Sequence, residues 1–199
     1  MNKELKFSKE LDFSKWLTNY LNNSTLYNKT GESTSITTEH NKSKKNGRPD
    51  VKVTTECKLL LHKYTKNRER FLSDPFYIEC KMNRKGILYW LQQFIRYKIK
   101  LGSEKHLSSE KYGDFHITVT IPEWLEKDNT LQIKKDMGGY TLEAYGKKDE
   151  NYWLNNFVLV RVLWHLGLGV LYSTPTPNNK KRLKIAFNHK EVLNVYPNK

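Results

Sequence analysis

A short apolar segment of this sequence ends by presenting two charged side chains on the same side. Residues 76–81 read FYIECK. The alternation of a β-strand directs Glu79 and Lys81 to one face, and Ile78 and Cys80 to the other. Placing a carboxylate and an ammonium on an apolar strand carries a desolvation cost. A hard cation held by Glu79, with Lys81 facing a phosphate or a water molecule, explains the pair.

A cation at Glu79 requires a second carboxylate. Mg²⁺ prefers oxygen ligands and is commonly held by one or two carboxylates together with water and substrate phosphate. Asp50 is the best candidate, because it opens the alternating segment 51–55 (VKVTT), which predicts a strand. Residues 56–58 repeat the order Glu-Cys-Lys, but Glu56 lies only six residues after Asp50. That spacing leaves little chain for a turn between two core strands, so we assign the site to Glu79.

These residues resemble the signature of the PD-(D/E)XK nuclease superfamily: Pro49-Asp50, then a strand ending in Glu79-Cys80-Lys81, then a helix. The resemblance covers roughly the first 121 residues. It implies an α/β fold with a restriction-endonuclease-like αβββαβ core, and Mg²⁺-dependent phosphodiester hydrolysis in which Mn²⁺ can substitute. Asp50, Glu79 and the Cys80 carbonyl would hold the metal, and Lys81 would orient the attacking water. The wide gap between Asp50 and Glu79 requires an insertion at about residues 59–74.

The segment 85–101 predicts the best-defined helix of the chain. On a wheel of about 100° per residue, one apolar stripe holds Ile87, Leu91, Phe94 and Ile95, and the adjacent stripe holds Trp90, Gln93, Tyr97 and Lys100. The Gln-x-x-x-Tyr spacing of Gln93 and Tyr97 resembles the motif that follows the catalytic strand in a RecB-like branch of the superfamily. That resemblance implies contact with nucleic acid beside the site. The alternative is the polar edge of an ordinary amphipathic helix.

Other candidate residues surround this constellation. Lys85, Arg96 and Lys100 would neutralise flanking phosphates. Glu10 lies in the segment 8–21, whose apolar spacing predicts a first helix. Some relatives, Holliday-junction resolvases among them, carry an additional metal-binding glutamate on that helix, although a surface glutamate is the commoner explanation.

The remaining elements predict one domain of mixed α/β type. The length of 199 residues suffices for one sizeable core. A mixed sheet would form the core within residues 1–121, including a polar loop or basic arm at 22–47, and residues 122–199 would add a helix and a hairpin. The further expected elements are a loop or short helix at 63–74, strands at 115–121, 167–172 and 182–187, and a helix at 151–166.

Charge indicates the class of partner. The chain holds 35 Lys and Arg against 21 Asp and Glu, a formal charge of +14, which is typical of proteins that bind a polyanion. The expected partner is DNA, while RNA and a homodimer stay open. No membrane span is expected, because the apolar segment 157–172 is short and carries Arg161 and His165. With no leader pattern and two cysteines expected to be reduced, a cytoplasmic protein is expected.

The sequence therefore predicts a metal-dependent deoxyribonuclease, with endonucleolytic cleavage favoured. Two alternatives account for the same charge. One is a non-catalytic nucleic-acid-binding protein with a degenerate nuclease fold. The other is a protein-binding effector of a mobile element, whose basic face meets an acidic partner.

Overall fold

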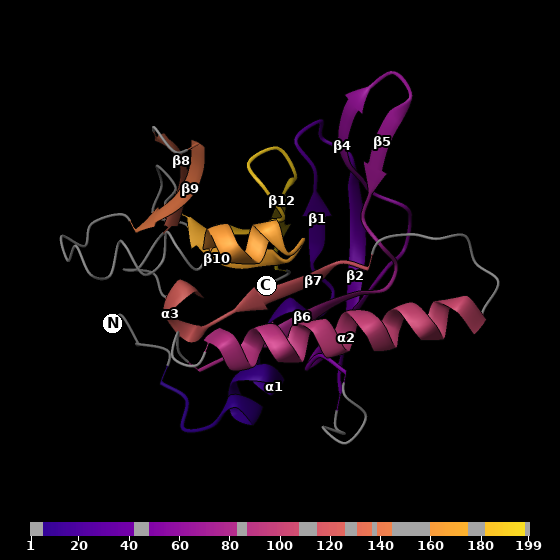
Figure 1. Cartoon of the computed structure of the whole chain (residues 1–199). Helices are drawn as coiled ribbons and strands as arrows, with labels where there is room; N and C mark the ends of the chain where they lie inside the picture. Colours follow the sequence, from indigo (N-terminus) through magenta and orange to yellow (C-terminus); the bar gives the residue numbers. More distant parts are fainter. Residues whose placement is uncertain are drawn as a thin grey trace.

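The computed structural model describes residues 6–41, 48–82, 87–107, 115–125, 131–136, 139–144, 160–174 and 182–197. Eight strands form a closed barrel in the order β1-β12-β11-β10-β7-β6-β3-β2 (Figure 1). These strands are β1 (Thr25–Tyr27), β2 (Ser33–His40), β3 (Val51–Thr55), β6 (Phe76–Cys80), β7 (Ile117–Thr120), β10 (Gly169–Thr174), β11 (Arg182–Ala186) and β12 (Val192–Tyr196). Two separate two-stranded sheets pair β4 (Leu60–Thr65) with β5 (Arg68–Phe71), and β8 (Leu131–Asp136) with β9 (Gly139–Ala144).

The closed barrel shows that the predicted open mixed sheet of restriction-endonuclease-like type is wrong. The polar segment 22–47, expected to be a loop or arm, instead supplies β1 and β2, although residues 42–47 lie outside the described part. β1 pairs antiparallel with both β2 and β12, through Thr25 opposite Ser35 and Thr25 opposite Tyr196. This double pairing closes the ring and makes the C-terminal strands part of the same sheet.

The strands around the predicted site follow a simple path. β3 runs antiparallel to β6, with Val51 opposite Ile78. Helix α2 (Ile87–Leu107) then connects β6 to β7, which lies parallel to β6. The β4–β5 hairpin occupies the chain between β3 and β6, where an insertion was expected. The expectation of a loop or short helix at 63–74 is therefore wrong, because these charged residues pair as strands.

Strand alternation divides the buried side chains into two hydrophobic clusters. In β6, Phe76, Ile78 and Cys80 pack in a cluster with residues of strands around the barrel and with α1 (Glu10–Leu21). Tyr77 points the opposite way, into a cluster covered by α2 and by the helical residues 160–165. The expected helix at 151–166 is thus present at 160–165, and residues 151–159 lie outside the described part.

Helix α2 buries residues of both predicted stripes. Phe94 of the apolar stripe is buried, whereas Ile95 of the same stripe is 53% exposed. Trp90 and Tyr97 of the adjacent stripe are buried together with Leu101, and they pack in one cluster with residues of β7 and β10.

Three further features of the structure bear on the sequence expectations. A short helix, α3 (Pro122–Leu125), directly follows the segment 115–121, where a strand was expected and β7 is found. Cys57 is exposed and Cys80 is buried, and both are free thiols. Among the described residues, no helix has the length and apolar character needed to cross a bilayer.

Candidate active site

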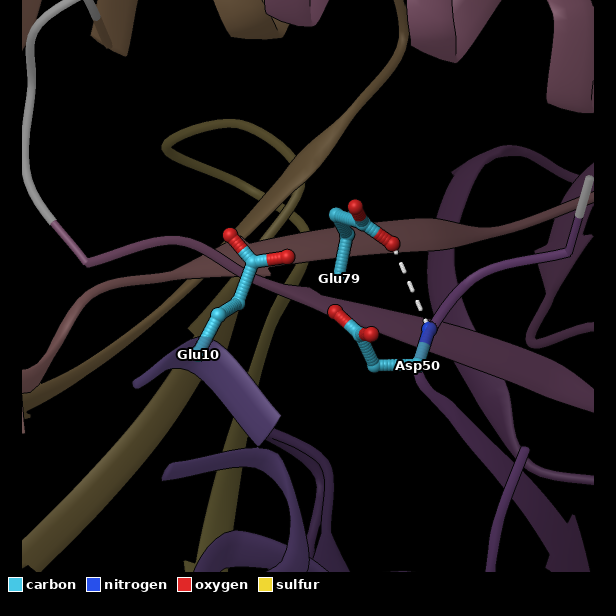
Figure 2. A group of neighbouring side chains, drawn as sticks. All are labelled: Glu10, Asp50 and Glu79. Atoms are coloured by element: carbon cyan, nitrogen blue, oxygen red, sulfur yellow. Dashed lines mark hydrogen bonds between the residues drawn. The ribbon is translucent and has the colours of Figure 1, made fainter. Parts of the chain in front are cut away.

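The antiparallel register of β3 and β6 brings Asp50 beside Glu79. Asp50 directly precedes Val51, which lies opposite Ile78. The Asp50 amide donates a hydrogen bond to Glu79 Oε2 at 3.3 Å (Figure 2), and the Cys80 amide donates one to Asp50 Oδ2 at 2.9 Å. Each strand therefore fixes the carboxylate of the other, and both carboxylates are buried.

Glu10 completes a group of three carboxylates. It is the first residue of α1, which packs against β2 and β6. One carboxylate oxygen from each of Glu10, Asp50 and Glu79 lies within 4.8 Å of the others. Figure 2 shows the three side chains converging from α1, from the start of β3 and from β6. The weakest of the sequence candidates, Glu10, thus lies with the two stronger ones.

Lys81 provides the positive charge in this group. It directly follows β6, and its amide donates to the Thr120 carbonyl at 2.9 Å, which extends the pairing with β7. Its ammonium forms an ion pair with Glu79 Oε1 and lies 3.6 Å from Glu10 Oε1. The predicted alternation is confirmed: Glu79 and Lys81 share one side, while Cys80 points into the core with Ile78.

The protonation equilibria reflect crowded negative charge. Burial and, after it, the charge of the neighbouring Asp50 carboxylate raise the pKa of Glu79 to about 8, although the charge and the hydrogen bond of Lys81 act to lower it. For Lys81, burial lowers the pKa, but the charges of Glu79, Glu10 and Asp50 together outweigh burial and leave it raised. The oxygens of the three carboxylates could ligate a divalent cation, and this hard-oxygen donor set suits Mg²⁺ or Mn²⁺.

Helix α2 contacts the same group of residues through Glu79. The Tyr97 hydroxyl donates to Glu79 Oε1 at 3.3 Å, and Gln93 Nε2 donates to the Tyr97 hydroxyl. Burial and the nearby charges of Glu79 and Asp50 raise the pKa of Tyr97, so its hydroxyl keeps its proton. Gln93 Oε1 is buried and lacks a hydrogen-bond partner in the described part of the chain. Gln93 and Tyr97 therefore lie on the side of Glu79 and Lys81, as the resemblance implies.

A cavity of about 390 Å³ opens onto this group. Its walls include the three carboxylates, Lys81, Gln93 and Tyr97. Four further wall residues were missed as site residues: Arg48, Met82, Tyr89 and Trp90. Arg48 directly precedes Pro49-Asp50, and Tyr89 lies one helical turn before Gln93, so proximity to the motif was the available signal.

The remaining predicted phosphate contacts lie elsewhere. Arg96 and Lys100 are on α2 but do not line the cavity; Arg96 is exposed, and Lys100 is half-buried. Lys85 lies outside the described residues. The Cys80 side chain packs in the core and its amide donates to Asp50, while its carbonyl stays a predicted metal ligand.

Comparisons with protein families, with curated proteins and with solved structures give no match to this chain.

Proposed function

We propose that this protein is a metal-dependent nuclease that hydrolyses phosphodiester bonds of DNA, with active-site residues of the PD-(D/E)XK type. The observation that carries the proposal is the convergence of Glu10, Asp50 and Glu79 within 4.8 Å, with Lys81 paired to two of them. The proposal rests on these side chains and on the β3–β6–α2 path that positions them. It does not rest on the overall fold, which is a closed barrel.

The carboxylates Glu10, Asp50 and Glu79 would hold Mg²⁺, and Mn²⁺ can take its place. A bound divalent ion in such a site polarises a phosphoryl oxygen and lowers the pKa of a bound water. The protein's own contribution is orientation. The Asp50 amide and the Tyr97 hydroxyl each hold one of the two oxygens of Glu79. Asp50 is held in turn by the Cys80 amide, so neither carboxylate has to reorganise when substrate enters.

Lys81 is the residue placed to act on the attacking water. Its ammonium is buried between Glu79 and Glu10 and keeps its proton, since its pKa is raised. A charged donor fixed at this point can hold a water molecule in line with the scissile bond and stabilise the negative charge that develops on phosphate.

The surroundings of the site favour a nucleic-acid substrate. The cavity has aromatic walls in Tyr89 and Trp90, and Tyr89 is 67% exposed, so its ring is available for contact with a base. The net charge of +14 attracts a polyanion. A degenerate relic that only binds nucleic acid would not need to retain three converging carboxylates and a buried lysine. We place this activity in the cytoplasm, where the free thiols Cys57 and Cys80 would remain reduced.

The direct experiment is a cleavage panel. The purified protein is incubated with supercoiled plasmid, linear duplex, single-stranded DNA, branched DNA and RNA, each with Mg²⁺, Mn²⁺ or EDTA. We expect cleavage of a DNA substrate with either metal and none in EDTA, and nicking of the plasmid would identify an endonuclease. Cleavage that persists in EDTA, or no cleavage of any substrate with either metal, would contradict the proposal.

A further inference from the structure

Three turns gather at the end of the barrel opposite the carboxylates. The end of the barrel that holds the candidate active site is formed by the start of β3 and the end of β6, next to Asp50 and Lys81. The register of β2 with β3 and of β1 with β12 directs three other segments to the far end: the β1–β2 turn at 28–32, the β4–β5 hairpin, and the β11–β12 turn at 187–191. Figure 1 shows the hairpin projecting from the end of the barrel away from α1.

A buried carboxylate fastens the hairpin to the β11–β12 turn. Glu191 is fully buried and accepts a hydrogen bond from the Tyr64 hydroxyl at 2.7 Å. It also forms an ion pair with Arg70 at 2.9 Å. The Asn188 side chain accepts hydrogen bonds from the Lys190 and Glu191 amides, which shapes the turn itself. The hairpin therefore has a defined position, although it lies outside the barrel.

Cations surround an exposed tyrosine on this surface. The Tyr64 ring is 37% exposed, with the Arg68 guanidinium 5.5 Å and the Lys190 ammonium 5.7 Å from its centroid. The His62 ring packs edge-on against it at 4.5 Å. On the neighbouring turn, Lys29 donates to the His189 carbonyl at 2.9 Å. We call the group Lys29, His62, Tyr64, Arg68, His189 and Lys190 the cationic patch.

The local field of the patch is positive. The pKa of His189 is lowered by partial burial and then by the charges of Lys190, Lys29 and His62. Among the acidic residues around these turns, Glu191 pairs with Arg70, and Glu69 pairs with Lys63 at 2.7 Å. Glu32 of the β1–β2 turn is exposed and accepts a hydrogen bond from the Asn28 side chain at 2.9 Å. The exposed cations Lys29, Arg68 and Lys190 outnumber this carboxylate.

We infer that the cationic patch binds the phosphate backbone of nucleic acid, at a segment of the substrate distant from the bond that is cleaved. This inference rests on the proposed nuclease function and extends it to the length of substrate that the protein holds. Clustered cations neutralise phosphates, and an exposed tyrosine among them offers a stacking surface for a base. Helix α2 runs from the cavity back toward this end of the barrel and carries the exposed Arg96 along the way.

The dimensions of the barrel set the length of substrate required. Strand β2 has eight residues and ends near the site at His40. At about 3.3 Å per residue, the two ends of the barrel lie roughly 26 Å apart. DNA carries two phosphates per base pair, one charge for each 1.7 Å of axis, so roughly 8 base pairs separate the two contacts. A duplex of about 10 base pairs centred on the site cannot also reach the patch, whereas one of about 40 base pairs can.

The test compares binding of 10- and 40-base-pair duplexes in EDTA, measured by fluorescence anisotropy. The variants are Lys190→Glu and the double variant Arg68→Glu/Lys190→Glu. Lys15→Glu, on the exposed face of α1, is the control for the single change, since it alters the net charge equally. For the long duplex we expect the double variant to bind about 10-fold more weakly than wild type, with a log–log salt slope smaller by about 1–2. The short duplex and the Lys15→Glu control should change less than about twofold.

An equal loss for both duplex lengths, or no loss for either, would overturn the inference. Normal melting of each variant shows that the barrel is intact, and Lys190→Gln provides a milder change should a charge reversal disturb the turn. The outcome is also separable from that of the proposed function. If the protein cleaves no substrate but the variants lose binding to the long duplex alone, the patch inference holds and the proposed nuclease function fails. If the protein cleaves DNA but neither substitution weakens binding of the long duplex, the nuclease function holds and the patch inference fails.

Discussion

Glu79 is the residue on which the contacts of the site converge. Its oxygens accept hydrogen bonds from the Asp50 amide, from Tyr97 and from Lys81, and its carboxylate lies beside those of Asp50 and Glu10. Such an arrangement is costly without a cation, because burial and the charge of Asp50 both disfavour the ionised form. We therefore propose that the carboxylate group is a ligand set for a cation rather than a structural ion-pair network.

Metal binding should appear as a gain in thermal stability. A cation that binds only the folded state, present at a concentration 100 times its dissociation constant, raises the free energy of unfolding by about 2.7 kcal/mol. For a chain of this size, that corresponds to an increase in Tm of roughly 5–10 °C. We expect Mn²⁺ to produce this shift in the wild type and not in Asp50→Asn, as measured by differential scanning fluorimetry. The same shift in both proteins would show that the metal binds elsewhere.

Gln93 and Tyr97 should support the reaction without supporting the fold. Tyr97→Phe keeps the ring packed and removes only the hydroxyl that donates to Glu79. The free energy of unfolding should therefore change by no more than about 1 kcal/mol. Gln93→Ala should also be close to neutral for stability. Both variants should melt near the wild type yet cleave more slowly, with a smaller loss than that of Glu79→Gln. If Tyr97→Phe and Gln93→Ala retain full activity, these residues only border the core.

At the scale of elements, the sequence predicts a strand where burial in the core requires apolar side chains. Residues 51–55 and 76–81 alternate or run apolar because both lie in the barrel core, and their strands were predicted. β2 (Ser33–His40) is mostly Ser and Thr and buries few side chains, so its sequence resembles a polar loop. The β4–β5 hairpin is likewise built from charged residues that become strands only by pairing with each other. The β-propensity of single residues cannot identify strands that are stabilised mainly by pairing with neighbouring strands.

The β4–β5 hairpin should depend on the ion pair that anchors it. Removing Arg70 leaves the fully buried Glu191 carboxylate without its cation, and breaking a buried pair in this way is strongly destabilising. Because Arg70 is itself partly exposed, we expect Arg70→Ala to cost about 2–3 kcal/mol, measured by urea unfolding. Lys63→Ala is the matched control from the same hairpin, since its pair with Glu69 is exposed and should contribute less than about 1 kcal/mol. Equal effects of the two substitutions would show that Glu191 does not anchor the hairpin.

At the scale of the whole molecule, the site was more predictable than the architecture. Asp50, Glu79 and Lys81 occupy short motifs next to apolar strands; strand alternation pairs Glu79 with Lys81, and the resemblance to the nuclease signature adds Asp50. Closure of the barrel depends on β1 pairing with β12, between residues 25–27 and 194–196. No local pattern encodes a contact across that length of chain, so the open sheet implied by the resemblance was wrong.

The net charge belongs to this scale as well. A chain of +14 that neutralises phosphates should bind duplex DNA with an affinity that falls steeply with salt, by a log–log slope of about −0.9 per phosphate neutralised. Anisotropy titrations of wild-type protein between low and moderate salt measure this slope. A flat dependence would remove the polyanion argument and favour an acidic protein as the partner.

The central claim is tested most directly by exchanging one oxygen of Glu79 for nitrogen. Glu79→Gln is nearly isosteric, so the fold should survive while a metal ligand is weakened. Glu56→Gln is the matched control, because residues 56–58 repeat the same Glu-Cys-Lys order and Glu56 is exposed beyond β3, at the other end of that strand. The measurement is the single-turnover rate of DNA cleavage in Mg²⁺ for the wild type and both variants. The account predicts that Glu79→Gln loses most cleavage while Glu56→Gln retains it; wild-type cleavage by Glu79→Gln would contradict the account.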